Sequence, residues 1–203
     1  AVVLPGEGLH PQDYQPPVLV LGQDQSQGIT SGMFQRLDTQ EEFDGIDVIP
    51  LIVRRSRVKW PPGEFNREST PECWSDDGLS GSQRPIGDAK AVFAGQACLA
   101  CSWYTERPWD QDSQRGACMP GYNVLLVDAN SYETYLLRLK GTSVKLARMF
   151  YAKGIYRQAA VRLSSERVED ARGAWYQMKA KTLRRLDEAD ASRAQSMLQD
   201  YVD

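Results

Sequence analysis

Four cysteines constrain how this chain can fold more than any other feature, because they are its only cysteines and all fall between residues 73 and 118. Cys98 and Cys101 are separated by two residues, the spacing at which a tight turn points two sulfurs at one ion. Cys73 and Cys118 can each add a thiolate and so complete a tetrahedral site. The spacing therefore predicts a metal clip that uses every cysteine of the chain.

The identity of the clip depends on the redox setting of the protein. The alternatives to structural zinc are two disulfides, an iron–sulfur cluster and unpaired core thiols. No apolar run approaches the roughly 20 residues that span a bilayer, and the start lacks the basic and then long apolar segment of a secretory signal. We therefore expect a soluble, non-secreted protein, which disfavours disulfides, and the wide cysteine gaps disfavour a ferredoxin-type cluster. Structural zinc is the favoured interpretation, and the other three stay open.

Charge is unevenly distributed along the chain. The formal net charge at pH 7 is −3, but residues 138–185 hold 13 Lys or Arg against 3 Asp or Glu. The remaining residues hold 11 basic and 24 acidic side chains. Such an asymmetry favours a polyanion-binding face, although a solvated basic surface would give the same count.

Apolar periodicity predicts a mainly β protein with α additions. A long strand over residues 46–60 begins in a core and ends in basic residues. Pro50 should place this strand at a sheet edge or a bulge, because proline cannot donate to the ladder. Alternation puts six of its residues on one face: Ile49, Leu51, Val53, Arg55, Arg57 and Lys59.

Regular elements resume after the cysteines. The pattern predicts strands over 122–127 and 132–140, a helix over 144–153, strands over 156–167 and 174–183, and an acidic helix over 187–203. In the strand over 174–183, alternation places Trp175, Lys179 and Lys181 on one face. The predicted organisation is an extended arm over residues 1–31, a barrel over 32–186 with the metal lobe inserted at about 73–118, and a C-terminal helix or tail over 187–203.

Motifs for catalysis are missing from the sequence. It has no phosphate-binding glycine loop, no Gly-x-Ser-x-Gly elbow and no His-Glu-x-x-His pair, and His10 is its only histidine. Four cysteine ligands would close a zinc site, whereas a catalytic zinc keeps one position open. Asp76 and Asp77 precede Gly78, which is more typical of a turn than of a hard-cation site. We expect a protein that is not an enzyme, and a metal-dependent nuclease is the weakest alternative.

The basic strands favour single-stranded nucleic acid as the ligand. Proteins that bind it combine a cationic groove with aromatic faces on which bases stack, each stack being worth about 1–3 kcal/mol. Strand patterning with a short helix between strand pairs fits an OB-like five-stranded barrel. The candidate nucleic-acid-binding residues are Arg55, Arg57, Lys59, Trp60, Trp103, Tyr104, Arg107, Lys145, Arg148, Trp175, Lys179 and Lys181.

The order of these features resembles that of the zinc-containing OB-fold single-stranded DNA-binding proteins of tailed phages and related mobile elements. The matching residues lie within about 32–183: Arg54 to Trp60 at a strand end, Cys73-x-Ser75-x-Asp77-Gly78, Cys98-x-x-Cys101, Cys118 before Tyr122, and Gly141-Thr142-Ser143 at a helix start. The resemblance implies structural zinc on Cys73, Cys98, Cys101 and Cys118. Some members use histidine among their ligands, whereas only cysteines are placed to serve here.

The same resemblance implies a function and a location. It implies a non-catalytic role in DNA replication or recombination in the cytoplasm of a bacterial or phage-infected cell. It also implies that the acidic segment 187–203 contacts replication or recombination proteins. The alternative function is a protein-interaction module of a multiprotein complex, in which the zinc lobe and the acidic end dock partners without direct DNA binding.

Overall fold

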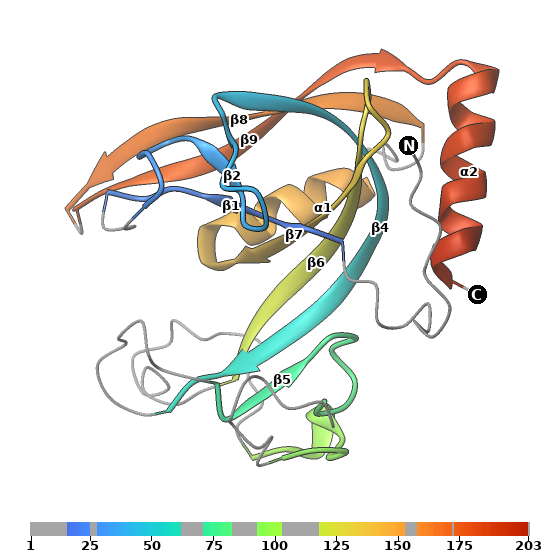
Figure 1. Ribbon diagram of the computed structural model, residues 1–203. Helices are drawn as coiled ribbons and strands as arrows, with labels where there is room; N and C mark the ends of the chain where they lie inside the picture. The colour runs from blue at the N-terminus through green and yellow to red at the C-terminus, as the bar shows by residue number, and fades with distance from the viewer. Residues whose placement is uncertain are drawn as a thin grey trace.

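One curled sheet forms the frame of the protein (Figure 1). The computed structural model describes residues 16–24, 28–61, 71–82, 93–102, 118–152, 158–171 and 173–202. Its strands are β1 (Val18–Leu21), β2 (Phe34–Arg36), β3 (Glu42–Phe43), β4 (Gly45–Lys59), β5 (Cys73–Ser75), β6 (Cys118–Asp128), β7 (Thr134–Lys140), β8 (Ala159–Asp170) and β9 (Gly173–Arg185). Its helices are α1 (Val144–Ala152) and α2 (Glu188–Val202), with short 3-10 turns η2 (Cys98–Ala100) and η4 (Gly141–Ser143). The strand order is β3-β2-β1-β7-β6-β4-β8-β9, and β5 pairs with β4.

Strand β4 holds this sheet together. It pairs antiparallel with β6 from Val48 to Lys59, with β8 at its start and with β5 at its end. Strand β4 lies between β6 and β8, but its pairing with β8 ends at Val48, so Pro50 pairs with β6 alone. Pro50 also marks the predicted bulge, because the β4–β6 register shifts between Pro50 and Ile52. Proline has no N–H to donate there, so the ladder is interrupted at little cost.

The bulge decides which β4 residues share a face. Ile49 and Leu51 belong to one buried cluster, and Val53 belongs to another. The predicted single face running from Ile49 to Lys59 is therefore wrong, because the extra residue in β4 changes the alternation. After the bulge, the alternation puts Arg55 and Arg57 on the same face as Val53.

Each face of the sheet is covered by one helix. Helix α1 lies inside the curl, where its Phe150 is buried with Val53 and other apolar side chains of β4, β6, β7 and β8. Helix α2 lies outside the curl, where Ala194 is buried with Ile49 and Leu51 (Figure 1). The sheet therefore has a concave face that packs on α1 and a convex face that packs on α2.

The predicted mainly β class is confirmed, and so are the strands and helices after residue 118, with shifts of a few residues at their ends. Two features differ from expectation. Val18–Leu21, assigned to the extended arm, forms β1 between β2 and β7, with Leu19 buried. The described strands number nine rather than five, and they make a curled half-barrel. Neither described helix has the length and apolar character needed to cross a membrane.

Side chains join the two ends of this half-barrel. The Gln23 amide, just after β1, donates to the Tyr176 carbonyl oxygen (2.9 Å) and accepts from the Tyr176 N–H (2.7 Å). Next to this contact, Gly32 leaves no room for a Cβ, which would lie 2.6 Å from the Tyr176 ring. Ser165 of β8 also donates to the Gly32 carbonyl oxygen. These contacts bring the β1–β2 hairpin against β8 and β9.

Candidate functional site

Two short chain segments hold three of the four cysteines beside the end of β4. Strand β5, which carries Cys73, pairs with the end of β4, and Lys59 lies opposite both Cys73 and Cys118 in the sheet. The Cys98 N–H donates to the Leu79 carbonyl oxygen (2.7 Å), and the Cys101 N–H donates to the Cys98 carbonyl oxygen (3.1 Å). The Cys98-x-x-Cys101 spacing thus forms a tight 3-10 turn, as the metal-clip interpretation requires.

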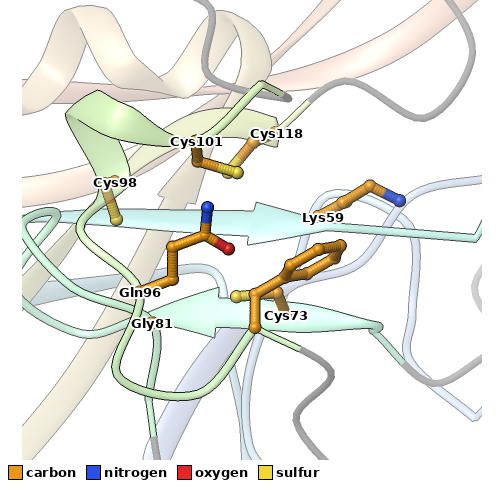
Figure 2. Close-up of a pocket in the computed structure, with 8 residues that line it drawn as sticks. Lys59, Cys73, Gly81, Gln96, Cys98, Cys101 and Cys118 are labelled. Atoms are coloured by element: carbon orange, nitrogen blue, oxygen red, sulfur yellow. The ribbon is translucent and has the colours of Figure 1, made fainter.

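All four cysteines line one small cavity of about 20 Å³. None of them is in a disulfide. The backbone of Gly81 forms part of the wall, where a Cβ would lie 2.2 Å from the Phe93 carbonyl oxygen and 3.2 Å from the Cys73 Sγ. Figure 2 shows the four side chains around this space, with the Gln96 amide projecting between them. The cavity has room for one water-sized particle or ion.

The thiols share this cavity without forming a coordination shell. Within the described ranges, no three His, Cys, Asp or Glu side chains converge closely enough to hold a metal ion. Burial, reinforced by the other three cysteines, raises the pKa of the Cys73 thiol to about 11. Burial also raises the pKa of the Cys118 thiol, although Arg57 acts in the opposite direction. The environment therefore favours protonated Cys73 and Cys118 thiols near neutral pH.

The Asp76–Asp77 segment makes a turn, which agrees with the sequence interpretation. Asp77 Oδ1 accepts hydrogen bonds from the N–H groups of Leu79 and Ser80 and from the Ser75 hydroxyl. These bonds outweigh burial and lower the pKa of Asp77. Gly78 follows with a φ of +73°, in the left-handed region that favours glycine. The turn uses the Asp77 carboxylate to hold its own backbone.

Lys59 lies in the cysteine cavity rather than on an open nucleic-acid surface. It lines the cavity, is 3% exposed and forms an ion pair with Glu72. Its Nζ also lies 5.9 Å from the centre of the Phe93 ring. An opposite charge beside a buried ammonium offsets part of its desolvation cost. Lys59 thus belongs to the cysteine lobe, by which we mean the end of β4, strand β5 and residues 76–82 and 93–102.

A groove of about 600 Å³ opens on the concave side of the β4–β6 ladder. It is lined by three arginines, two tyrosines and small residues: Arg55, Ser56, Arg57, Pro120, Gly121, Tyr122, Val144, Arg148 and Tyr151. None of these lining residues is acidic. Arg55 and Arg148 form no ion pair within the described part of the chain. The groove is therefore a cationic surface with aromatic rings beside it.

Two tyrosines of this groove were missed by the sequence analysis. Tyr122 lies opposite Arg55 in the β4–β6 ladder. Tyr151 is 53% exposed, and its hydroxyl donates to the Val53 carbonyl oxygen (2.6 Å), which holds the ring in place. Tyr151 occurs seven residues after Val144 and three after Arg148, so helical spacing could have placed all three on one side of the predicted helix.

Several predicted nucleic-acid-binding residues lie elsewhere. Met178 and Ala180 of β9 pack against the concave core, so the alternating Trp175, Lys179 and Lys181 belong to the opposite face. Lys179 forms an ion pair with Glu166 (2.9 Å). Lys145 is exposed but is not among the groove-lining residues. The two predicted binding faces are thus on opposite sides of the sheet.

Trp60 is not among the described residues that line the groove. Trp60 follows the end of β4, and the Lys140 ammonium lies 5.3 Å from the centre of its ring. Trp103, Tyr104 and Arg107 lie outside the described residues. Of the twelve candidates, the structure brings together Arg55, Arg57 and Arg148.

Comparisons with protein-family models, with curated proteins and with solved structures found no match to this chain. The resemblance to zinc-containing OB-fold proteins therefore rests on the sequence pattern alone. Any functional conclusion has to come from the cysteine cavity and the groove themselves.

Proposed function

We propose that this chain is a non-catalytic single-stranded DNA-binding protein of replication or recombination, and that the strand lies in the groove of Arg55, Arg57 and Arg148. The observation that supports this proposal is the convergence of three arginines and two tyrosines on one groove, with no acidic residue among the lining residues that the structure describes. Arginines neutralise phosphates, and aromatic rings stack on bases. Tyr151 presents a half-exposed ring at the groove, which gives a base a surface to stack on.

The shape of the groove favours a single strand over a duplex. Its wall is a strand ladder on one side and helix α1 on the other. A flexible single strand can turn its bases toward Tyr122 and Tyr151 while its phosphates meet the arginines, whereas a duplex keeps its bases stacked inside. In this proposal the curled sheet plays the part of an OB-like barrel, with the binding surface on its concave side.

The cysteine cavity is proposed to hold a structural zinc ion. The donor chemistry fits, because four cysteines that form no disulfide line a cavity the size of one ion. Cys73, Cys98, Cys101 and Cys118 would hold the ion, which would supply a closed cross-link between β5, η2 and β6. The thiols would have to turn inward, lose their protons and displace the Gln96 amide.

An oligonucleotide titration at increasing salt tests the DNA-binding proposal. If three arginines each neutralise one phosphate, the slope of log K against log salt should be about −2 for a single strand. Arg148→Gln should weaken binding and reduce the size of the slope by about 0.7. Fluorescence anisotropy with a labelled oligothymidylate measures both quantities.

Two matched variants locate the binding face. Lys145→Gln removes a charge from the same helix as Arg148, and Lys179→Gln removes one from the convex face of the sheet. Lys179→Gln should not change the affinity by more than about twofold, because a charge on the far side of the sheet is screened within about 10 Å at 0.1 M salt. Lys145→Gln should weaken binding less than Arg148→Gln does, because Lys145 does not line the groove. A larger loss in Lys179→Gln than in Arg148→Gln would move the site to the convex face and refute the groove.

A protein-interaction module remains a second candidate, favoured by two exposed leucines on the cysteine lobe. Leu79 and Leu99 are 67% and 74% exposed, and they belong to the two segments joined by the hydrogen bond from Cys98 N–H to Leu79. Exposed apolar side chains of this kind occur at protein interfaces. The double variant Leu79→Ser with Leu99→Ser should leave oligonucleotide affinity unchanged if the groove is the functional site. Loss of a protein partner in this variant, with no oligonucleotide binding by the parent chain, would establish the second candidate.

A further inference from the structure

We propose that the cysteine cavity controls the groove, so that metal bound by the cysteines strengthens polyanion binding, with Arg57 as the positioning residue that couples the two sites. The proposal rests on the proposed function, because it takes a single-stranded polyanion as the groove ligand. It goes beyond a purely structural zinc site, since it makes the affinity of the groove depend on occupancy of the cavity.

Arg57 belongs to both sites. Its side chain lines the groove, and its guanidinium donates to the Cys118 carbonyl oxygen (3.3 Å). Arg57 is 7% exposed, so the guanidinium depends on this arrangement for part of its hydrogen bonding. A change in the position of Cys118 therefore changes the position of a groove cation.

The backbone also connects the sites over a short distance. Along the β4–β6 ladder, Lys59 lies opposite Cys118, Arg57 opposite Pro120, and Arg55 opposite Tyr122. The first pair lines the cavity, and the next two line the groove. The ladder is also held closely from the β7 side, because a Cβ on Gly121 would lie 2.8 Å from the Leu139 carbonyl oxygen. If metal binding holds Cys118 in place, it should therefore also hold the groove-lining residues of β6, which begin at Pro120.

The second arginine of β4 contacts the cysteine lobe as well. A Cβ on Gly78 would lie 2.8 Å from the Arg55 Cβ, so the Asp77–Gly78 turn packs directly on Arg55. This turn leads from β5 to the segment that meets Cys98. Arg148 differs, because it comes from α1, whose main contacts are with β4, β6, β7, β9 and η4. Two of the three groove arginines thus depend on the order of the lobe.

Metal binding should affect the polyanion affinity of the groove in two opposite ways, through the charge of the metal site and through the ordering of Arg55 and Arg57. A divalent ion on four thiolates leaves a net negative charge near the groove, which repels a polyanion. Order in Arg55 and Arg57 has the opposite effect, because a positioned cation loses less entropy when it binds. Salt screens the repulsion, whereas the ordering effect persists. We therefore expect the coupling to be positive and to be clearest at about 0.1–0.15 M salt, where the Debye length is about 8–10 Å.

The test measures both directions of the coupling on the full chain. Fluorescence anisotropy gives the affinity for a labelled oligothymidylate with Zn²⁺ bound and after Zn²⁺ is removed by a chelator. We expect about tenfold tighter binding with Zn²⁺, within the usual range of coupling between sites. Because coupling is reciprocal, saturating oligothymidylate should tighten Zn²⁺ binding by the same factor, as measured by competition with a chromophoric chelator.

Variants assign the coupling to Arg57. Arg57→Gln should bind oligothymidylate more weakly and lose most of the dependence on Zn²⁺. Arg148→Gln is the matched control: it should also weaken binding but keep the dependence on Zn²⁺, because its helix packs mainly on β4, β6, β7 and β9. Equal Zn²⁺ dependence in the two variants would refute the role of Arg57.

Hydrogen exchange separates local control from loss of the whole fold. After Zn²⁺ removal, the amides of Cys118, Met119, Gly121 and Tyr122 should exchange faster, whereas those of the β8–β9 ladder should not change. Global unfolding on chelation would overturn the proposal, since the metal would then act on the entire fold. Equal oligothymidylate affinity with and without Zn²⁺ would overturn the coupling and leave the proposed function standing. Absence of oligothymidylate binding in both states would overturn the proposed function itself.

Discussion

Gly81 sets the dimensions of the cysteine cavity at the scale of a single residue. Its backbone N–H donates to the Gln96 carbonyl oxygen (2.9 Å), and its carbonyl oxygen accepts from the Gly95 N–H (2.9 Å). These bonds hold the segment after β5 against the segment that leads to Cys98. A side chain at position 81 would not fit, because its Cβ would lie too close to the Phe93 carbonyl oxygen and the Cys73 Sγ. Glycine is therefore required here for close approach of two backbones.

Gly81→Ala should destabilise the cysteine lobe and weaken metal binding. The added methyl group meets a backbone carbonyl, so the two segments must separate, at a cost of about 1–3 kcal/mol typical of overpacking. We expect the affinity for Zn²⁺ to fall by about tenfold, as for changes in the surroundings of metal ligands. Competition with a chromophoric chelator measures this loss. Ser80→Ala, at the exposed neighbour, should leave the affinity unchanged; an equal affinity in both variants would show that this close approach does not position the thiols.

Helix α2 is held on the convex face by an ionic cluster as well as by apolar packing. Asp190 accepts a hydrogen bond from the Tyr132 hydroxyl and forms an ion pair with Arg184 (2.6 Å). The Arg193 guanidinium stacks on the Tyr132 ring, 3.6 Å from its centre. Because the groove opens on the concave side, the docked part of this acidic helix lies away from the groove arginines. Partner binding through the predicted acidic end would therefore leave the groove accessible.

The docking of α2 should weaken in acid. The Tyr132 hydroxyl, followed by Arg184, lowers the pKa of Asp190 below its ordinary value of 3.8. A carboxylate with a lowered folded-state pKa contributes stability that is complete above the unfolded-state pKa and is lost as the pH falls through the folded-state value. The denaturation midpoint should therefore fall as the pH drops below about 4.

Asp190→Asn tests this assignment by removing the titrating group. The variant should be less stable than the parent at pH 7, and the difference should shrink as the pH falls below the ordinary aspartate value. Chemical denaturation at a series of pH values measures it. Glu188→Gln changes an exposed carboxylate of the same helical turn and should preserve the parent's pH dependence. A stability difference between Asp190→Asn and the parent that does not change with pH would contradict the assignment.

The whole molecule depends on contacts between segments far apart in the sequence. Gln23 and Tyr176 are separated by 153 positions, yet the Gln23 amide satisfies both backbone groups of Tyr176. In this way a side chain takes the place of a strand partner beside β9, whose neighbour in the sheet is β8. Such long-range contacts hold the curl in shape and keep the concave face around α1.

Gln23→Ala should loosen the curl without disturbing either β-hairpin. Two hydrogen bonds to the backbone are lost, and each is worth about 0.5–1.5 kcal/mol. We expect a lower melting temperature and faster exchange of the Tyr176 amide. Ser31→Ala, at an exposed position of the same hairpin, should change neither measurement. Unchanged exchange at Tyr176 would show that the two ends of the half-barrel are held together by other contacts.

Local patterns in the sequence determined the elements, and they could do so because strand and helix periods repeat over a few residues. The hairpin of β6 and β7, helix α1 and helix α2 follow from this periodicity. The spacing of Cys98 and Cys101 likewise predicted a tight turn, which η2 forms. Arg55, Arg57 and Arg148 were recognisable as basic residues on regular elements.

Only the tertiary structure decided which of these residues meet. The bulge at Pro50 places Arg55 and Arg57 on the face opposite Ile49 and Leu51. The position of this bulge depends on how β4 pairs with β6, and not on the sequence of β4 alone. The burial of Lys59 likewise depends on residues outside β4, namely Glu72 and the cysteine lobe. Periodicity carries no information about such distant partners, because packing between separate segments sets them.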